Sequence, residues 1–316
     1  MVIKLVVIGG GSGVASILKG IKHINNINIK AIITVADNGG STGRLKTKYG
    51  IPAVGDVRNV LVSLAESEIL LKELMDYRFL GDSSAGIDVE GHSLGNLILA
   101  ALTDSSGDFM EAIKKLEKIL RIKGSIIPST VSVVDIFAKM KDGSIVAGET
   151  NIRESNKEIE SVFYDQNVES TPEAIEAIEE ADYIIFGIGS LFTSIIPNII
   201  VPGIREAINA SNAETIYLSN IMSEAGETDN YTVKDHIDAI ESHLEGKIKT
   251  IVYPSNIIPI QVVAAYSQEK AKMVVLDEEL KTEYNVEERD LLVFDNDQAR
   301  HDSNKIKQWF KDKVVV

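Results

Sequence analysis

Short apolar runs alternate with longer amphipathic stretches along most of this 316-residue chain. Five of the runs are β-branched and apolar nearly throughout, as in strands that helices cover on both faces. They span residues 3–9, 29–36, 182–189, 214–220 and 248–255. Strands buried in this way belong mainly to parallel sheets, so the pattern predicts a doubly wound α/β core.

The stretch between the second and third runs has a different periodicity. Residues 56–67, 92–105 and 108–122 place apolar side chains three and four positions apart, which predicts a helical segment at about 55–122. Residues 129–150 instead alternate apolar and polar positions around Asp142-Gly143, which predicts a small β-hairpin insertion. Residues 272–277 resemble a further strand, and a helix is expected around Trp309. Without repeats or long linkers, residues 1–316 are expected to form a single domain.

The charge balance excludes several classes of partner. The chain carries 47 acidic and 32 basic residues, a net charge of −15, and shows no basic cluster. Nucleic acids and anionic membranes are therefore not expected as partners. No cysteine is present, so disulfides and thiolate metal sites are excluded. The first apolar run is too short for a signal sequence, and no segment approaches about 18 uncharged apolar residues, so we expect a cytoplasmic protein without membrane insertion.

A glycine-rich turn follows the first predicted strand in the stretch "VVIGGGSGVAS". It contains Gly9, Gly10, Gly11, Ser12 and Gly13. Backbone N–H groups at such a strand-to-helix turn can cradle a phosphate without a basic side chain. The alternative is that the glycines only permit close packing. A G-x-G-x-x-G match fails at Val14 and no G-K-[ST] ending follows, which argues against a dinucleotide oxidoreductase and a P-loop.

A second turn of similar design follows the third strand, in "YIIFGIGSLFTSIIPN". It supplies Gly187, Gly189, Ser190, Thr193 and Ser194, ahead of a helix whose first turn can accept Pro197. The alternative function of Thr193 or Ser194 is to cap that helix. Ligands bind open α/β sheets at the carboxyl ends of the strands, so two anion-compatible turns there favour a diphosphate or a nucleotide.

A third polar element follows the second strand, in "VADNGGSTGRL". Asp37 and Asn38 offer oxygen ligands for Mg²⁺, which takes one or two carboxylates together with water and substrate phosphates. Arg44 could reach a phosphate. The alternative for Asp37 and Asn38 is an Asx turn.

Three further segments, "GDVRN", "EGHSLGN" and "LSNIMSEAGETD", combine glycine with polar side chains. They supply Asp56, His92, Asn96, Asn220, Glu227 and Asp229. Taken singly, Asp56 is expected as a helix N-cap, His92 as a satisfied interior histidine, and Glu227 and Asp229 as solvated loop acids. Taken together, the segments predict a polar crevice along one edge of the sheet.

The segments quoted above are followed or joined by "YRF" and, late in the chain, by "ARHD". Their order is the one found in the YvcK family, also called the gluconeogenesis factor family. The chain resembles this family over nearly its whole length. That family is similar to CofD, the 2-phospho-L-lactate transferase that acts on a deazaflavin with Mg²⁺. The resemblance implies a Rossmann-like three-layer α/β/α fold and binding of a UDP-sugar such as UDP-N-acetylglucosamine. It also implies a non-catalytic function in cell shape and cell-wall synthesis during gluconeogenic growth.

The resemblance assigns functions to further residues. The glycine turns would hold the diphosphate, and Tyr266 and Arg300 match positions linked to UDP-sugar binding. A tyrosine ring can lie against a base or sugar, and arginine can bind a diphosphate through two hydrogen bonds. The alternatives are helix packing for Tyr266 and a surface ion pair for Arg300.

The chain departs from the family pattern at two places. Asp37-Asn38 stands where the family has two aspartates. This change removes one carboxylate and makes a bound metal ion less expected. Ile188 stands where the family has a proline. A UDP-sugar-binding regulator, which requires no cofactor, is the favoured hypothesis. Its expected partners are a UDP-sugar or another nucleotide diphosphate, proteins of cell-wall synthesis and a second copy of the chain. The alternative is a Mg²⁺-dependent CofD-type transferase with Asp37 on the metal and Arg44 or Arg58 on the transferred charge.

Overall fold

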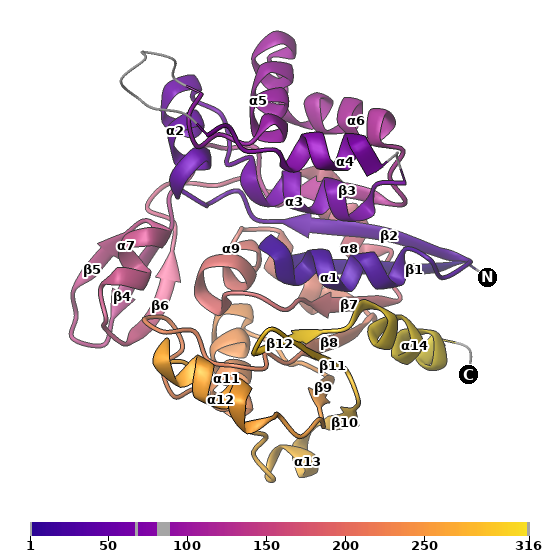
Figure 1. The fold of residues 1–316 in the computed structure, drawn as a ribbon, viewed down its shortest axis with the longest axis vertical. Helices are drawn as coiled ribbons and strands as arrows, with labels where there is room; N and C mark the ends of the chain where they lie inside the picture. The colour runs from indigo at the N-terminus through magenta and orange to yellow at the C-terminus, as the bar shows by residue number, and fades with distance from the viewer. Residues whose placement is uncertain (1, 67–68, 81–88, 315–316) are drawn as a thin grey trace.

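The computed structural model describes residues 2–66, 69–80 and 89–314, and a seven-stranded sheet forms its centre (Figure 1). Every neighbouring pair in this sheet is parallel, which confirms the predicted α/β class. The strand order is β10 (Asn285–Arg289), β9 (Thr250–Pro254), β8 (Glu214–Leu218), β7 (Tyr183–Phe186), β1 (Ile3–Gly9), β2 (Ile27–Ile33) and β3 (Ser125–Pro128).

Helices cover both faces of the sheet and complete a three-layer α/β/α fold. On one face α1 (Gly11–Ile21) packs against α3 (Gly55–Leu64) and α14 (Ser303–Val314). The β1–β2 and β7–β8 connections run in opposite directions across the sheet. Because such crossovers are right-handed, the second connection places its helices on the other face. That connection contains the short π-helix η2 (Leu191–Ile195), α9 (Ile196–Ile199) and α10 (Ile204–Ala210), which pack with α8 (Pro172–Glu179) and α11 (Val233–Leu244).

The predicted helical segment extends over the β2–β3 side of the sheet. It contains α3, α4 (Ile69–Asp76), α5 (Leu94–Ser106) and α6 (Phe109–Leu120), and α2 (Gly40–Tyr49) contacts α5 from outside this segment. The remaining helices are α7 (Glu149–Glu154), α12 (Ile260–Gln268) and α13 (Leu280–Glu283). The strands are buried on both faces, as the apolar run from Leu5 to Ile8 in β1 shows, and this burial explains their unbroken apolar character.

The predicted hairpin insertion is present but differs in extent. Strands β4 (Phe137–Met140) and β5 (Ile145–Ala147) pair around Asp142-Gly143, and Gly143 has a φ of +84°, as the turn prediction requires. Residues 129–136 are not part of the hairpin, because Thr130 accepts the Ser132 N–H in a local turn (3.1 Å). A third strand, β6 (Ile159–Phe163), pairs with β4, so the insertion is a three-stranded antiparallel sheet that also carries α7.

Several elements differ from the sequence prediction. Strands β3 and β10 lie at the two edges of the main sheet and were not predicted. Residues 272–277 form no strand, and Met273 makes only an isolated bridge to Met222. A hairpin of β11 (Leu292–Asp295) and β12 (Gln298–His301) was not predicted either. The helix around Trp309 is present as α14.

No single helix in the described ranges is long and apolar enough to cross a membrane. The bent pair Leu191–Ile199 and Ile204–Ala210 reaches the required length and composition only when its two parts are combined.

Candidate functional site

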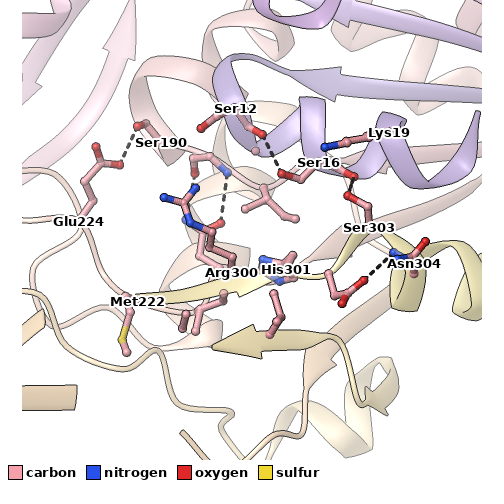
Figure 2. A pocket seen from close by; sticks show the side chains of 18 of the residues that line it. Ser12, Ser16, Lys19, Ser190, Met222, Glu224, Arg300, His301, Ser303 and Asn304 are labelled. Carbon is pink, nitrogen blue, oxygen red and sulfur yellow. Dashed lines mark hydrogen bonds between the residues drawn. The ribbon is translucent and has the colours of Figure 1, made fainter. Parts of the chain in front are cut away.

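The two glycine turns meet at the point where the strand order reverses. The chain leaves β1 toward β2 and leaves β7 toward β8, so the adjacent strands β1 and β7 form a topological switch point, the usual place for a ligand crevice. A cavity of about 810 Å³ opens there (Figure 2). Of the predicted site residues, the cavity is lined by Ser12, Gly13, Gly189, Ser190, Asn220, Tyr266 and Arg300.

Close packing between the turns explains several of the glycines. A Cβ on Gly13 would lie 2.5 Å from the carbonyl carbon of Ile188, and closer still to its oxygen. A Cβ on Gly9 or Gly187 would lie 2.6 or 2.7 Å from the Val14 side chain. Gly13 and Gly187 therefore allow α1 to pack directly against the second turn, and Gly9 leaves room for Val14 within the first, as the packing alternative predicted.

The start of α1 is also suited to an anion. Gly10 is the N-cap residue and provides no side-chain cap, and the first turn of α1 contains no acidic residue. The first N–H groups of a helix have no acceptor within that helix, and the helix dipole adds positive potential there. The backbone of Gly10 and Gly11 lies beside the carboxylate of Asp56, whereas Ser12 and Gly13 lie on the cavity wall.

The second turn is held by protein contacts at two of its glycines. Gly187 donates its N–H to the carbonyl of Ile8 (2.8 Å). The amide of Asn220 bonds Gly189 on both sides, accepting from its N–H (3.4 Å) and donating to its carbonyl (2.9 Å). The geometry therefore shows Asn220 bracing this turn. The Ser190 hydroxyl donates to Glu224 (2.6 Å) at the cavity wall.

Thr193 and Ser194 are buried inside η2, whose N-cap residue is Ser190, so the capping interpretation was wrong for both. Glu227 accepts the N–H of Phe192 (2.7 Å) and both the N–H and hydroxyl of Thr193 (3.2 Å each). Burial, with the nearby Glu224 charge, raises the pKa of Glu227 to about 8. Glu227 is therefore a buried carboxylate that holds η2, and the expectation of a solvated loop acid was wrong.

Other loop and helix positions match their predictions. Asp229 is exposed, as expected, and accepts the N–H of Gly226 (2.8 Å). Pro197 lies at the start of α9. Sequence reasoning missed Asn198, whose side-chain amide donates to the carbonyls of Gly9 (3.2 Å) and Ser194 (2.8 Å). This buried amide joins the two turns into one unit.

The third polar element lies outside the cavity lining. Asp37 accepts the N–H of Gly39 (2.7 Å), which is the Asx turn given as the alternative. Asn38 accepts the N–H of Thr150 in the insertion (3.4 Å). Arg44 donates to the carbonyl of Glu90. In the structure, Asn38 and Arg44 therefore connect neighbouring segments.

Helices α2 and α5 meet through a small polar cluster. Asn96 donates to the Ser41 hydroxyl (3.1 Å), which also bonds the ring Nδ1 of His92 (2.8 Å). His92 is thus the satisfied interior histidine that was expected. Arg58, a candidate for the transferase alternative, is ion-paired with Asp76.

The charge of Asp37 acts on two buried acids, Asp56 and Glu149. Burial and the charge of Asp37 raise the pKa of Asp56 to about 7. Burial and the charges of both aspartates raise the pKa of Glu149 to about 8. Asp56 lies in the first turn of α3, whose N-cap residue is Val54, so the N-cap interpretation of Asp56 was wrong.

The described residues contain no group of three or more His, Cys, Asp or Glu side chains placed to hold a metal ion. A hydrated Mg²⁺ needs only one or two carboxylates, and the interacting pair Asp37 and Asp56 fits that smaller donor set.

The residues assigned through the family resemblance line the cavity from the C-terminal part of the chain. The Tyr266 hydroxyl in α12 donates to the carbonyl of Ala299 in β12 (3.3 Å). Arg300 is exposed and donates to the side chain of Gln298 (2.6 Å). In the described part of the chain, no carboxylate forms an ion pair with Arg300.

Sequence reasoning missed other residues on the cavity wall. These are Ser16, Lys19, His23, Met222, Glu224, His301, Asp302, Ser303 and Asn304. They belong mostly to α1, the loop after β8 and the β12–α14 junction. The periodicity of α1 could have placed Ser16 and Lys19 on the face of Ser12, but no local signal brings the β12–α14 junction to that helix.

The fold and the joined turns define a Rossmann-like three-layer α/β protein with a crevice at its switch point. Two crystal structures from Bacillus halodurans, one described as a UPF0052 family member, superpose with TM-scores of 0.94 and 0.92 at 40% identity. They cover 98% and 96% of this chain and 100% and 98% of their own.

Sequence comparison identifies the family. The model described as 2-phospho-L-lactate transferase CofD matches residues 5–292, and the chain belongs to this family. The gluconeogenesis factor of Bacillus subtilis is 43% identical over 307 residues, covering 96% of this chain and 95% of the relative. That of Halalkalibacterium halodurans is 42% identical over 315 residues, covering 96% and 94%.

Proposed function

We propose that this protein is a gluconeogenesis factor that binds a UDP-sugar of the UDP-N-acetylglucosamine type and regulates other proteins without turning the ligand over. It would act in the cytoplasm, where cell shape and cell-wall synthesis during gluconeogenic growth depend on it. The names of its relatives support the gluconeogenic part of this proposal.

The observation that carries the proposal is the join between the two turns. Gly13 at the start of α1 packs against Ile188 in the second turn, and both line a cavity of about 810 Å³. That volume is within the range of sites for ligands of nucleotide size. Arg300 and Lys19 add positive charge to the cavity of a protein whose net charge is −15. The carboxylates of Glu224 and Asp302 balance these charges on the wall as a whole. Two basic side chains close to the start of a helix can nevertheless bind a diphosphate.

Tyr266 supplies an aromatic face on the same wall. An aromatic ring can lie against a base or sugar, whereas the glycine turns bind only polar groups. The combination supports a ligand with a ring on one side of a diphosphate.

The alternative function is a Mg²⁺-dependent transfer of the CofD type. It is favoured by the family match and by the interacting carboxylates of Asp37 and Asp56. Bound Mg²⁺ would neutralise phosphate charge there, and Asp37 with Asp56 would hold it. Both Arg44 and Arg58 bond other protein groups in the structure, which weakens their assignment to the transferred charge.

Calorimetric titration tests the two functions. We expect UDP-N-acetylglucosamine to bind without Mg²⁺, to be recovered unchanged, and to bind at least about tenfold more weakly to Arg300→Ala. Lys281→Ala, which removes a basic side chain on α13, is the matched control and should bind as the wild type does. Preferential binding of GDP that depends on Mg²⁺ would overturn the regulator in favour of the transferase.

A further inference from the structure

The cavity wall carries the basic side chains of Lys19 and Arg300 and the acidic side chains of Glu224 and Asp302. Figure 2 shows Lys19 and Glu224 toward opposite ends, with Arg300 between them. Lys19 and Arg300 attract an anion, whereas the carboxylate of Glu224 repels one. A ligand that is anionic along its whole length would match only part of this wall. A ligand with an anionic middle and a neutral, hydrogen-bond-donating end would match both Arg300 and Glu224.

Contacts of both its side chain and its backbone hold Glu224 in place. Its Oε2 accepts the Ser190 hydroxyl (2.6 Å), its Oε1 pairs with Arg153 of α7 (3.0 Å), and its backbone N–H donates to the Thr228 hydroxyl (2.8 Å). Arg153 is itself paired with Glu149 (3.4 Å), so the insertion helps to position Glu224. A fixed side chain loses little conformational freedom when a ligand arrives.

The chemistry of a carboxylate decides what it can bind. Among the described residues, each carboxylate oxygen of Glu224 has one partner, and a carboxylate oxygen can accept a second hydrogen bond. Sugar hydroxyls and amide N–H groups are donors and can satisfy that capacity. The oxygens of a fully ionised phosphate or carboxylate only accept, so they would meet Glu224 with like charge and no shared proton.

We propose, resting on the UDP-sugar function above, that Glu224 determines specificity for the group beyond the diphosphate. It accepts hydrogen bonds from a neutral sugar and excludes a terminal phosphate. The diphosphate then lies at the start of α1 near Arg300, and the sugar lies beside Ser190 and Glu224. Arg153 is a positioning residue that acts through Glu224.

Titrations of wild type and Glu224→Gln with UDP-N-acetylglucosamine and with UTP, both in EDTA, test this proposal. We expect the wild type to prefer the UDP-sugar. Glutamine keeps an oxygen that can accept the Ser190 hydroxyl but removes the negative charge. The affinity of Glu224→Gln for UDP-N-acetylglucosamine should therefore fall about tenfold, and its affinity for UTP should rise. The ratio of the two affinities should fall by about a hundredfold. Glu283→Gln, an exposed carboxylate on α13, is the matched control and should retain the wild-type preference.

Two further variants separate charge from position. Glu224→Asp keeps the charge but shortens the side chain, so it should lose sugar affinity without gaining UTP affinity. Arg153→Gln should lower sugar affinity less than Glu224→Gln does, and UTP should still be excluded. Thermal melts recorded by circular dichroism show whether each variant is folded.

The outcomes distinguish this inference from the proposed function. In one outcome, Arg300→Ala binds UDP-N-acetylglucosamine more weakly than the wild type, as expected, while Glu224→Gln still prefers this ligand over UTP as strongly as the wild type does. In that case Glu224 does not determine specificity, and the UDP-sugar function stands. If the wild type binds neither ligand, the UDP-sugar function fails and the specificity inference fails with it.

Discussion

Replacing Gly13 with alanine tests the join between the two turns most directly. The new Cβ would lie 2.5 Å from the Ile188 carbonyl carbon and 3.1 Å from the Gly189 nitrogen, whereas real Cβ contacts are essentially never shorter than 3.0 Å. Both neighbours are backbone atoms, which cannot rotate away as a side chain can. We therefore expect α1 and the second turn to separate by roughly 1 Å.

Overpacking of this kind costs about 1–3 kcal/mol, and the gain in helix propensity from glycine to alanine offsets at most about 1 kcal/mol. The obstacle is rigid, so the larger cost should prevail, with a net loss of about 1–2 kcal/mol in the free energy of unfolding. For a chain of this length, that loss lowers the Tm by about 1.5–3 °C.

Thermal unfolding followed by circular dichroism measures this loss. Ser12→Ala, in the same turn of α1, adds no atoms and should change the free energy of unfolding by less than about 0.5 kcal/mol. A Gly13→Ala protein that melts at or above the wild-type temperature would refute the packing argument. Calorimetry on the same sample should show weaker binding of UDP-N-acetylglucosamine, because the two turns no longer hold their relative positions.

Three other substitutions test separate parts of the site. Asp56→Asn should stabilise the protein at pH 8 but not at pH 4. The folded-state pKa of about 7 lies above the ordinary value of 3.8, so the wild type loses stability as the pH rises between those values. Urea unfolding across this range measures the difference, and parallel pH profiles for both proteins would contradict it. Asn220→Ala should cost about 1 kcal/mol and weaken nucleotide binding, because Gly189 loses both of its side-chain hydrogen bonds. If calorimetry shows that Asn220→Ala binds the nucleotide as tightly as the wild type does, the hydrogen bonds from Asn220 are not needed to hold the Gly189 turn. Glu227→Ala should destabilise the protein by at least about 2 kcal/mol more than Glu227→Gln, which keeps an acceptor for the buried N–H groups of η2. Equal melting temperatures for these two variants would exclude that function of Glu227.

The main sheet and the glycine turns could be predicted because their signals are local. Strand β1 has the predicted bounds, 3–9, since burial on both faces gives an unbroken apolar run. The edge strand β10, with the sequence NVEER, has no such run because edge strands are partly exposed. Its assignment depends on pairing with β9, which no window of local sequence contains.

The position of Arg300 depends on the same kind of distant contact. The β11–β12 hairpin turns at Asn296 and Asp297, both with positive φ, and its strands are only four residues long. Its place beside α1 is fixed by Ser303, which donates to the carbonyl of Ser16 (3.0 Å) and packs against Gly20. Local sequence could therefore indicate a turn there but not the helix that it meets.

The buried acids show the limit of residue-by-residue inference. The sequence around Glu227 is polar and rich in turn-forming residues, which is typical of an exposed loop. Its carboxylate is nevertheless buried, because η2 presents two N–H groups and a hydroxyl that need an acceptor. The burial of an acidic residue is decided by the donors that surround it, and those donors lie more than thirty positions away in the chain. Because Glu224 bonds Ser190 across the same gap in sequence, the contacts that build the second turn also place a carboxylate on the cavity wall.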